Sequence, residues 1–349
     1  MDVRDEGDRT DTVYAVLAQA RQRVLPAVRE AVDGLPGAIR HLVGVHYGWW
    51  DEAGTPLANA DTGAGKGLRP ALVLLAGDAV GGDRTAAVPA AVAVDLAHNA
   101  SLLHDDVIDR DATRRHRPAI WSSFGVAAAI LAGDALLILA NQVLARAPVP
   151  LCDRGLSHFN ASGQQLIDGE YADARSERCD EAVLEECVAM AAAKTGALLA
   201  ASCALGAIAG GAQADRVEHL RAFGEDLGLA LQLVDDLLSI WGTQRNTGKP
   251  HLSDLRARRK TLPVAAALAH GGTASRRLAD LYRSRTPLTH ADLCEATDLI
   301  EAAGGRAWAQ GEAERRHTLA LAHLALARPQ PAARHALTAV ADLIIHRHH

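Results

Sequence analysis

The chain has 349 residues, enough for one large domain or for two of ordinary size. Apolar residues make up 49% of it but aromatic residues only 3%, so Ala, Leu and Val dominate the core, a composition that favours helices over sheets. The 36 basic and 42 acidic residues leave a formal charge of −6, which argues against general binding to nucleic acid or to an acidic membrane surface.

Apolar residues recur with helical spacing from residue 13 onward, whereas residues 1–12 are polar and are predicted to be disordered. A first helix is predicted from Val13 to about His41, and a connection with Gly and Pro follows, ending at residues 65–70. Long apolar segments come next, at about 71–80, 86–110, 123–146, 157–176, 181–210 and 214–242. After a polar, basic loop at 244–260, further helices are predicted from 261 to the C-terminus, with a break at 271–290.

The sequence lacks strong alternation of β-branched residues, and no Asn-Gly or Asp-Gly hairpin signal falls between apolar runs. The segments 86–110 and 214–242 are apolar on nearly every face, which is typical of central helices in a large bundle. We find no shift in composition that would mark a second domain. The sequence therefore predicts an all-α fold with one domain over residues 13–349.

The five cysteines are odd in number and form no Cys-x-x-Cys pair, a pattern typical of reduced thiols in a cytoplasmic protein. The charged start of the chain contains no apolar signal segment. Apolar runs are interrupted by charges, Gly or Pro before they reach eighteen residues, so we expect no membrane span. The His-rich end, residues 346–349, is interpreted as a solvated tail.

Two acidic pairs stand at apolar helical runs. Asp105 and Asp109 are four residues apart and so share one helix face, with Asp106 beside them. The second pair is Asp235 and Asp236. Either pair alone would be interpreted as a solvated surface, but both are embedded in apolar sequence, where unpaired charge is costly. Crowded carboxylates attract hard divalent cations such as Mg²⁺, which prefer oxygen ligands and recruit substrate phosphates.

A basic segment follows each acidic pair. Arg114 and Arg115 come after the first, and Lys249 with residues 256–260 after the second, while Lys194 lies inside an Ala-rich helix. Each basic run alone is typical of a solvated face. An acidic helix end followed by a basic loop, found twice, instead suits a metal-bridged polyanion that Arg and Lys hold from the other side.

Taken in order, these motifs resemble the trans-isoprenyl diphosphate synthase (polyprenyl synthetase) family, in particular its geranylgeranyl diphosphate synthases. The matching stretches all lie within residues 65–264: residues 65–70, His98, residues 104–109, Arg114–Arg115, Lys194–Thr195, Gln232, Asp235–Asp236, residues 247–250 and Asp254–Leu255. The resemblance implies an all-α helical bundle around a deep central cavity, of the isoprenoid synthase type, and a homodimer.

The resemblance also implies roles for individual residues. Mg²⁺ would be ligated by Asp105, Asp109 and Asp235, with Asp106 and Asp236 in support. The allylic diphosphate would be held by Arg114, Lys194 and Lys249, and isopentenyl diphosphate by Lys66, Arg69, His98 and Arg115. Thr195 and Gln232 complete the substrate-binding set, and Asp105, Asp109, Lys194 and Asp235 are the residues to which catalysis is assigned.

The implied reaction joins isopentenyl diphosphate head-to-tail to dimethylallyl, geranyl or farnesyl diphosphate. The metal and the cationic side chains stabilise the departing diphosphate, the double bond attacks the allylic cation, and a proton is lost, so that ionisation, condensation and elimination follow one another. The side chains four and five residues before Asp105, Ser101 and Ala100, are small, and Ala97 lies one turn further away. Without a bulky stop there, the expected product is geranylgeranyl diphosphate.

Three positions depart from the family pattern. Ser239 replaces the third aspartate of the second motif, Glu170 replaces a glutamine before Asp173, and His116 replaces a glycine. The truncated second motif leaves a class I terpene cyclase open as an alternative, and a regulatory subunit of a heteromeric synthase is a further one. The retained cations of the isopentenyl diphosphate site and the complete first motif favour a chain-elongating enzyme. The aromatic segment 47–50 is interpreted as packing.

Overall fold

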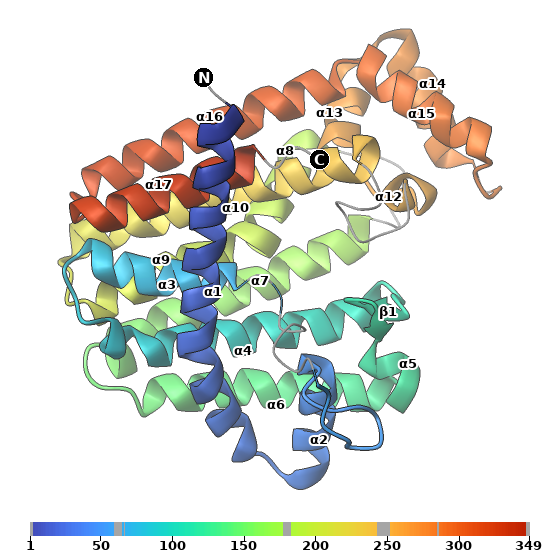
Figure 1. Ribbon diagram of the computed structural model, residues 1–349. Helices are drawn as coiled ribbons and strands as arrows, with labels where there is room; N and C mark the ends of the chain where they lie inside the picture. Colours follow the sequence, from blue (N-terminus) through green and yellow to red (C-terminus); the bar gives the residue numbers. More distant parts are fainter. Residues whose placement is uncertain are drawn as a thin grey trace. The chain divides into compact units, whose positions relative to one another are not determined.

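The computed structural model describes residues 3–58, 65, 67–176, 183–242, 252–284 and 286–346, with side chains from residue 12 onward. Within these ranges the named elements are helices, apart from two strands of two residues each (Figure 1). The predicted all-α class is therefore confirmed. The central cavity that the resemblance implies stays a prediction.

The longer helices, in chain order, are α1 (Val3–Asp33), α2 (Gly37–Tyr47), α3 (Leu68–Ala79), α4 (Arg84–Ile108), α6 (Val126–Ala145), α7 (Leu156–Ser176), α8 (Leu184–Ala191), α9 (Ala197–Ala209), α10 (Ala214–Trp241), α13 (Leu262–His270), α14 (Gly272–Arg283), α15 (His290–Ala302), α16 (Gly305–Leu326) and α17 (Pro331–Ile345). Short helices are α5 (Ile120–Phe124) and α12 (Ser253–Arg256). Two π-helical turns, η2 (Leu151–Gly155) and η3 (Ala192–Gly196), precede α7 and α9.

The apolar segments of the sequence correspond to helices within a few residues: α3, α4, α6, α7 and α10 each match one predicted segment. The predicted segment 181–210 contains α8, η3 and α9. Helical periodicity with few β-branched residues is thus a sufficient signal for these elements, and α3, α4, α6 and α10 each bury many Ala, Leu or Val side chains.

Three boundaries differ from the prediction. Helix α1 begins at Val3, because the charged residues before Val13 are compatible with a helix and include no proline. It ends at Asp33 rather than near His41, since Pro36 has the extended conformation of a helix N-cap and starts α2. The predicted break at 271–290 is largely occupied by α14, which follows a turn at Gly271, where φ is 79°.

The chain divides into two compact units. Unit 1 comprises residues 1–163, 198–221 and 323–340, and unit 2 comprises residues 164–197, 222–322 and 341–349. The first aspartate motif therefore belongs to unit 1 and the second to unit 2. That residues 13–349 form a single domain stays a prediction.

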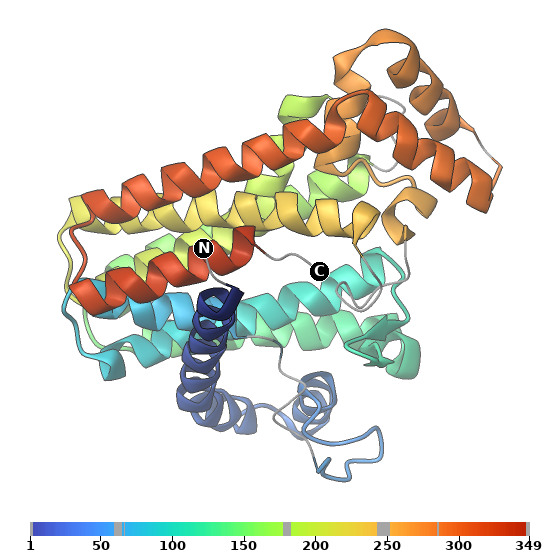
Figure 2. The same ribbon diagram turned by 45° about the horizontal axis from the view of Figure 1, so that its top comes forward.

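In unit 1, α4 packs against α6, and Figures 1 and 2 both show the two helices side by side. Helix α3 packs on α4, and α1 contacts both of them. Close packing of α3 against α9 depends on Gly206, because a Cβ there would lie 2.0 Å from the carbonyl oxygen of Val73. Helix α4, whose C-terminal end carries the first aspartate motif, thus packs against three neighbouring helices.

In unit 2, α13, α14 and α15 pack together around a core that includes Leu255, Leu278 and Leu293; these helices are orange in Figure 2. A second core joins α8, α10, α13 and α16, with Leu233 at its centre and fully buried. Because α10 contributes to this second core, the turn of α10 that carries Asp235 and Asp236 is fixed from the side of Leu233.

Three helical stretches are long and apolar enough, by length and composition, to cross a membrane: 84–108, 126–145 and 184–209. Most of the apolar window is buried inside the protein for the first and third stretches, but only 33% of it is buried in α6. The expectation that the chain has no membrane span is therefore not confirmed.

Candidate active site

The first aspartate motif occupies the C-terminal end of α4, where Arg114 binds two of its carboxylates. Arg114 Nε donates to Oδ1 of Asp106 at 2.7 Å, and Arg114 Nη2 donates to Oδ2 of Asp105 at 3.0 Å. Arg114 comes from β1 (Thr113–Arg114), which pairs with β2 (Arg117–Pro118) in a short antiparallel hairpin. The hairpin thus supplies the positive charge that keeps the crowded carboxylates together.

The two adjacent aspartates differ in exposure. Asp106 is only 1% exposed, and burial raises its pKa to about 6, while its hydrogen bond with Arg114 acts in the opposite direction. The Asp105 side chain is 18% exposed, and Asp109 is the C-cap of α4 and also partly exposed. Asp105 and Asp109 are therefore the carboxylates that an external cation could reach.

The motif is not a complete metal site by itself. Among the described residues, no group of three or more acidic, His or Cys side chains could hold a metal ion. Its donors nevertheless fit a hard divalent cation: all are carboxylate oxygens, and Oδ2 of the buried Asp106 has no hydrogen-bond partner within the described ranges. A cation held here would need further oxygen ligands, which a diphosphate supplies.

A separate cluster of cations lies in unit 1 around His98. Arg69, on the first turn of α3, places Nη1 3.1 Å from His98 Nε2 on α4. The pKa of His98 is well below its usual value because the ring is buried and because Arg69 and Arg115 lie near it. A neutral His98 accepts the hydrogen bond from Arg69, so the ring orients that guanidinium group.

Arg115 joins this cluster through an unusual backbone conformation. Arg115 and His116 form the turn of the hairpin with φ of 52° and 62°, in the left-handed region that glycine adopts most readily. The sequence departs from the family's glycine at 116, and His116 itself adopts the left-handed conformation there. A Cβ built on Gly65 would lie 3.0 Å from Nη2 of Arg115, so the guanidinium lies close against the loop before α3.

A buried polar network, which no sequence motif indicated, lies next to this cluster. The Tyr47 hydroxyl donates to Oδ2 of Asp95 at 2.8 Å, and the Asn99 amide donates to the same oxygen at 3.3 Å. His46 Nε2 in turn donates to Oδ1 of Asn99 at 3.1 Å. The packing interpretation of segment 47–50 holds for Trp49, which is 2% exposed and stacks on the Tyr47 ring. For Tyr47 it is incomplete, because the hydroxyl serves the polar network.

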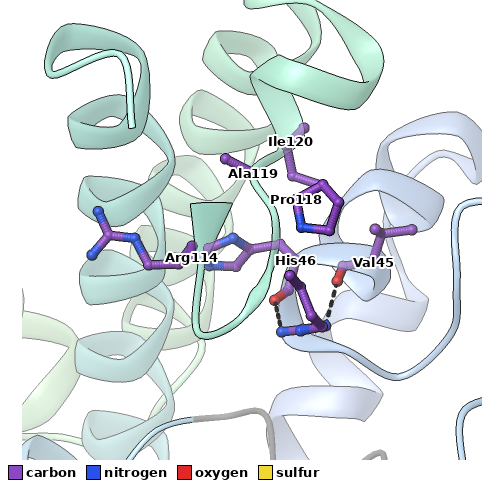
Figure 3. Close-up of a pocket in the computed structure, with 7 residues that line it drawn as sticks. Val45, His46, Arg114, Pro118, Ala119 and Ile120 are labelled. Carbon is purple, nitrogen blue, oxygen red and sulfur yellow. Dashed lines mark hydrogen bonds between the residues drawn. The ribbon is translucent and has the colours of Figure 1, made fainter. Parts of the chain in front are cut away.

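Arg117 ties the hairpin to α2. Its two terminal nitrogens each donate at 2.9 Å, one to the carbonyl of Val45 and the other to that of His46, as the dashed lines in Figure 3 mark. These carbonyls belong to the last turn of α2, where a helix leaves acceptors unpaired. The small pocket in Figure 3 is lined by Val45, His46, Arg114, Arg117, Pro118, Ala119 and Ile120. We interpret this pocket as part of the hairpin's support.

In unit 2, Lys194 is held by two carboxylates of α7. Its Nζ lies 2.7 Å from Oδ2 of Asp173 and 3.0 Å from Oε1 of Glu170. The close approach depends on Gly169, because a Cβ there would lie 2.5 Å from the backbone nitrogen of Lys194. Glu170 and Asp173 therefore form the anionic partner that a lysine in an Ala-rich helix requires.

A chain of hydrogen bonds runs from η3 through α10 to α13. The Thr195 hydroxyl donates to Oε1 of Gln232 at 2.6 Å, and Gln232 Nε2 donates to Oδ1 of Asp236 at 2.8 Å. The backbone N–H of Leu262 donates to Oδ2 of Asp236 at 2.8 Å. Thr195, Gln232 and Asp236 are thus brought together and bind one another, while the roles assigned to them in substrate and metal binding stay predictions.

Asp235 and Asp236 point to different environments. Asp235 is exposed, whereas Asp236 is 6% exposed and burial raises its pKa to about 7. Ser239, at the place of the family's third aspartate, donates to the carbonyl of Asp236 in its own helix at 2.9 Å. Asp235 is therefore the residue of this motif that could reach a metal ion.

Two predicted substrate cations, Lys66 and Lys249, lie outside the described residues. The basic run before α13 is partly structural: Lys260 Nζ donates to the carbonyl of Ser176 at 2.6 Å, and Arg258 Nη2 donates to that of Thr286. Sequence alone gave no sign that these two side chains bind main-chain carbonyls.

Comparisons with known proteins place relatives beside this chain. Residues 54–300 match the family model described as polyprenyl synthetase. A (2E,6E)-farnesyl diphosphate synthase of Mycobacterium tuberculosis is 45% identical over 317 residues, covering 90% of this chain and 88% of the relative. A geranylgeranyl diphosphate synthase of the same organism is 40% identical over 319 residues, covering 90% and 89%.

Solved structures give the same result. A polyprenyl synthetase from Streptomyces coelicolor A3(2) superposes with a TM-score of 0.91 at 42% identity, covering 95% of this chain and 99% of the other. A polyprenyl synthase from Caulobacter crescentus CB15, complexed with calcium and isoprenyl diphosphate, has a TM-score of 0.80 at 27% identity, covering 95% and 97%.

The helical fold, the aspartate motif and the clusters of Arg and Lys define an enzyme of the prenyltransferase class, in isoprenoid biosynthesis. This chain belongs to the polyprenyl synthetase family, the trans-isoprenyl diphosphate synthases, whose structures include complexes with divalent metal ions.

Proposed function

We propose that this enzyme condenses isopentenyl diphosphate with an allylic diphosphate and that its main product is geranylgeranyl diphosphate. The observation that carries elongation is a second group of side chains in unit 1: Arg69, His98 and Arg115 do not bind the aspartate motif in the contacts described above, whereas Arg114 binds Asp105 and Asp106. An enzyme that only ionises one allylic diphosphate has no need of a second group of phosphate-binding cations. This feature favours a synthase over a terpene cyclase, and the complete first motif favours an enzyme over a regulatory subunit.

In the proposed reaction, the allylic C–O bond breaks and the diphosphate leaves with the bonding electron pair. The terminal carbon of the isopentenyl double bond forms the new C–C bond, and the released diphosphate takes up the proton that is lost. Asp105, Asp109 and Asp235 would hold Mg²⁺, which supplies positive charge for the departing diphosphate. Arg114 adds charge-assisted hydrogen bonds to the leaving group once it exchanges its carboxylate partners for it, and the resemblance assigns Lys194 to the allylic diphosphate as well.

The proposed length of twenty carbons rests on small side chains in α4. Ala100 and Ala97 are small and buried, and Ser101 turns its hydroxyl back to the carbonyl of His98 at 2.8 Å. None of the three is bulky enough to stop a chain that grows toward α4. A farnesyl product is the second candidate, because a relative 45% identical is a farnesyl diphosphate synthase.

The product assay tests this proposal directly. The protein is incubated with Mg²⁺, labelled isopentenyl diphosphate, and dimethylallyl, geranyl or farnesyl diphosphate, and the products are separated with and without phosphatase. We expect label to become extractable only after phosphatase, as geranylgeraniol with each starter. Farnesol alone, with no elongation of farnesyl diphosphate, would replace the proposed length by fifteen carbons. Hydrocarbon formed without phosphatase from the allylic substrate alone would overturn the synthase.

The substitution Asp105→Ala should lower the turnover rate by about three orders of magnitude.

We also propose a homodimer in a reducing, cytoplasmic environment. Helix α6 carries exposed apolar side chains at Val126, Ile130, Leu131 and Ile138, between 41% and 61% exposed. An apolar helix face of this kind fits the same face of a second copy. All four described cysteines, Cys152, Cys187, Cys203 and Cys294, are free thiols, which supports a reducing compartment.

A further inference from the structure

Arg21, on α1, contacts the loop that precedes α3. Its Nη1 donates to the carbonyl of Gly65 at 3.2 Å, although 44 residues separate the two in sequence. Gly67, with φ of 69°, packs on the same side of α1, because a Cβ there would lie 3.4 Å from the Arg21 Cβ and 3.5 Å from the Leu17 carbonyl oxygen. Arg21 therefore fixes the loop on both sides of position 66 in the sequence.

The other terminal nitrogen of Arg21 lacks a hydrogen-bond acceptor within the described part of the chain. Nη2 is buried, and it has no hydrogen-bond partner among the described residues. An unpaired buried donor of a charged group is costly, so such a group is rare in a folded protein unless a ligand or water completes it. An acceptor oxygen brought by a ligand would satisfy it.

Arg21 shares one carboxylate with the cations already assigned to substrate. Burial raises the pKa of Asp95 to about 6, and the Tyr47 hydrogen bond together with the charges of Arg115, Arg69 and Arg21 partly offsets that rise. Three guanidinium groups therefore lie close enough to Asp95 to act on its charge. One carboxylate leaves an excess of positive charge, which suits a diphosphate.

We infer that Arg21 is a positioning residue of the isopentenyl diphosphate site: it anchors Gly65 and adds a third guanidinium group to Arg69 and Arg115. The inference rests on the proposed function for the identity of the anion. The diphosphate brings the acceptor oxygens that the buried donor lacks, and the anchored loop holds Arg115 against Gly65. No family motif contains Arg21, and only the fold of α1 onto the loop reveals it.

Neighbouring arginines on α1 provide the contrast. Arg23 is exposed, two residues away on a different face of the helix. Arg29 lies with its guanidinium carbon 5.0 Å from the centre of the Trp49 ring, so its charge is used in a cation–π contact. Arg23 is therefore a matched control, with the same chemistry on the same helix but without the loop contact.

The experiment compares the wild type with Arg21→Gln, Arg21→Lys and Arg23→Gln. Binding of isopentenyl diphosphate is measured by calorimetry with Mg²⁺ and without an allylic substrate, so that no turnover occurs. KM is then measured for isopentenyl diphosphate and for geranyl diphosphate. We expect Arg21→Gln to raise the Kd and KM for isopentenyl diphosphate about tenfold, as for one charge-assisted hydrogen bond. The KM for geranyl diphosphate should change less than twofold.

The variants separate a positioning role from a merely structural one. Arg21→Lys keeps the charge but loses the second donor arm, so its Kd should fall between those of the wild type and Arg21→Gln, and Arg23→Gln should match the wild type. Equal rises in both KM values, or unchanged binding in Arg21→Gln, would overturn the inference. If Arg21→Gln fails to fold, Arg21→Lys decides the question, and an unchanged Kd there overturns it. A wild type that binds no isopentenyl diphosphate would instead overturn the proposed function.

Discussion

Asp95 is the residue on which the cationic cluster of unit 1 converges. It accepts hydrogen bonds from Tyr47 and Asn99, and it acts on the charges of Arg115, Arg69 and Arg21. Two opposite effects act on the pKa of this carboxyl group: burial disfavours its charged form, and the nearby arginines favour that form. Burial has the larger effect, since the pKa of Asp95 rises to about 6.

This balance predicts a pH-dependent stability. A carboxyl whose folded-state pKa is raised binds a proton more tightly in the folded chain than in the unfolded chain, so its contribution to stability falls as pH rises from about 4 through about 6. Asp95→Asn removes the titration. Relative to Asp95→Asn, the wild type should therefore lose about 2 kcal/mol of unfolding free energy between pH 4 and pH 7. Urea unfolding at both pH values measures the difference.

Asp298→Asn is the control for this measurement, because Asp298 is exposed on α15. Any pH dependence of the Asp95→Asn difference beyond that of this variant is assigned to Asp95. An Asp95→Asn difference with no such excess would show that Asp95 has the same affinity for protons in both states, and the buried-carboxylate interpretation would be wrong.

Sequence reasoning at this scale found the residues that stand in motifs and missed those that do not. Asp105, Arg114 and Lys194 were recognisable because acidic and basic residues in apolar sequence require partners. Arg21 and Asp95 gave no such signal, since their contacts join residues 44 and 48 positions apart. Arg21 also resembles any other arginine on a polar helix face. Only the packing of α1 and α2 on α4 makes them neighbours.

Helix α10 shows how one turn separates two adjacent aspartates. Successive residues on a helix point about 100° apart, so Asp235 is exposed while Asp236 is directed inward, where Gln232 and Leu262 occupy its two oxygens. The bond to Leu262 satisfies an N–H at the first residue of α13, where a helix leaves donors unpaired. The doublet thus combines an accessible carboxylate with an anchor for the next helix.

Substituting each aspartate separately should divide the two roles. Asp235→Asn should lower the affinity for Mg²⁺ and reduce turnover about a hundredfold or more, with an unchanged free energy of unfolding. Asp236→Asn should lower the free energy of unfolding by about 1–3 kcal/mol, because Asp236 accepts two hydrogen bonds and an amide has only one acceptor oxygen. The amide NH₂ group would then face the donor of either Gln232 or Leu262. The substitution should also speed hydrogen exchange at the start of α13. Metal titration, denaturation and hydrogen exchange measure these effects.

The matched pair of variants makes the outcome decisive. Loss of metal affinity in Asp236→Asn, with α13 as well protected as in the wild type, would assign Asp236 to the metal and reject its role as an anchor. Equal effects of both substitutions on unfolding would show that the exposed Asp235 is also part of the fold.

At the scale of elements, the long helices were predictable because their apolar faces repeat with helical period. The π-helical turn η3 was not, although it carries Lys194 and Thr195. Its signal is distributed over three elements: Gly169 on α7, Gly196 in η3 and Gly228 on α10, where a Cβ on Gly228 would lie 2.6 Å from the Gly196 Cα. A sequence shows these glycines singly, and only the structure shows that they let α7, η3 and α10 approach one another closely.

At the scale of the whole molecule, helix α6 is the least enclosed of the apolar helices. It packs on α4 along one side, while Leu131 and Ile138 are 56% and 61% exposed. Large exposed apolar side chains that recur along one helix are typical of an interface or of a membrane-facing surface. By composition α6 is also long and apolar enough to cross a membrane. The two interpretations make opposite predictions for the purified protein.

The proposed homodimer predicts that α6 of one copy covers α6 of the other. The double substitution of Leu131→Asp with Ile138→Asp should therefore weaken association at least a hundredfold, because each copy loses two buried apolar side chains, worth about 1 kcal/mol or more apiece, and gains unpaired charge. Sedimentation velocity over a range of concentrations measures the shift from dimer to monomer. Leu326→Asp, at a residue 55% exposed on α16, is the control and should leave the dimer intact.

Vesicle flotation distinguishes the remaining interpretation, since a helix that faces a second copy has no reason to bind lipid. The wild type should stay with the soluble fraction in the presence of neutral or anionic vesicles, and its dimer should persist. Flotation of the wild type that Leu131→Asp with Ile138→Asp abolishes would show that lipid covers α6. A wild type that is monomeric at every concentration and does not float would leave this face without an occupant, and the homodimer would be rejected.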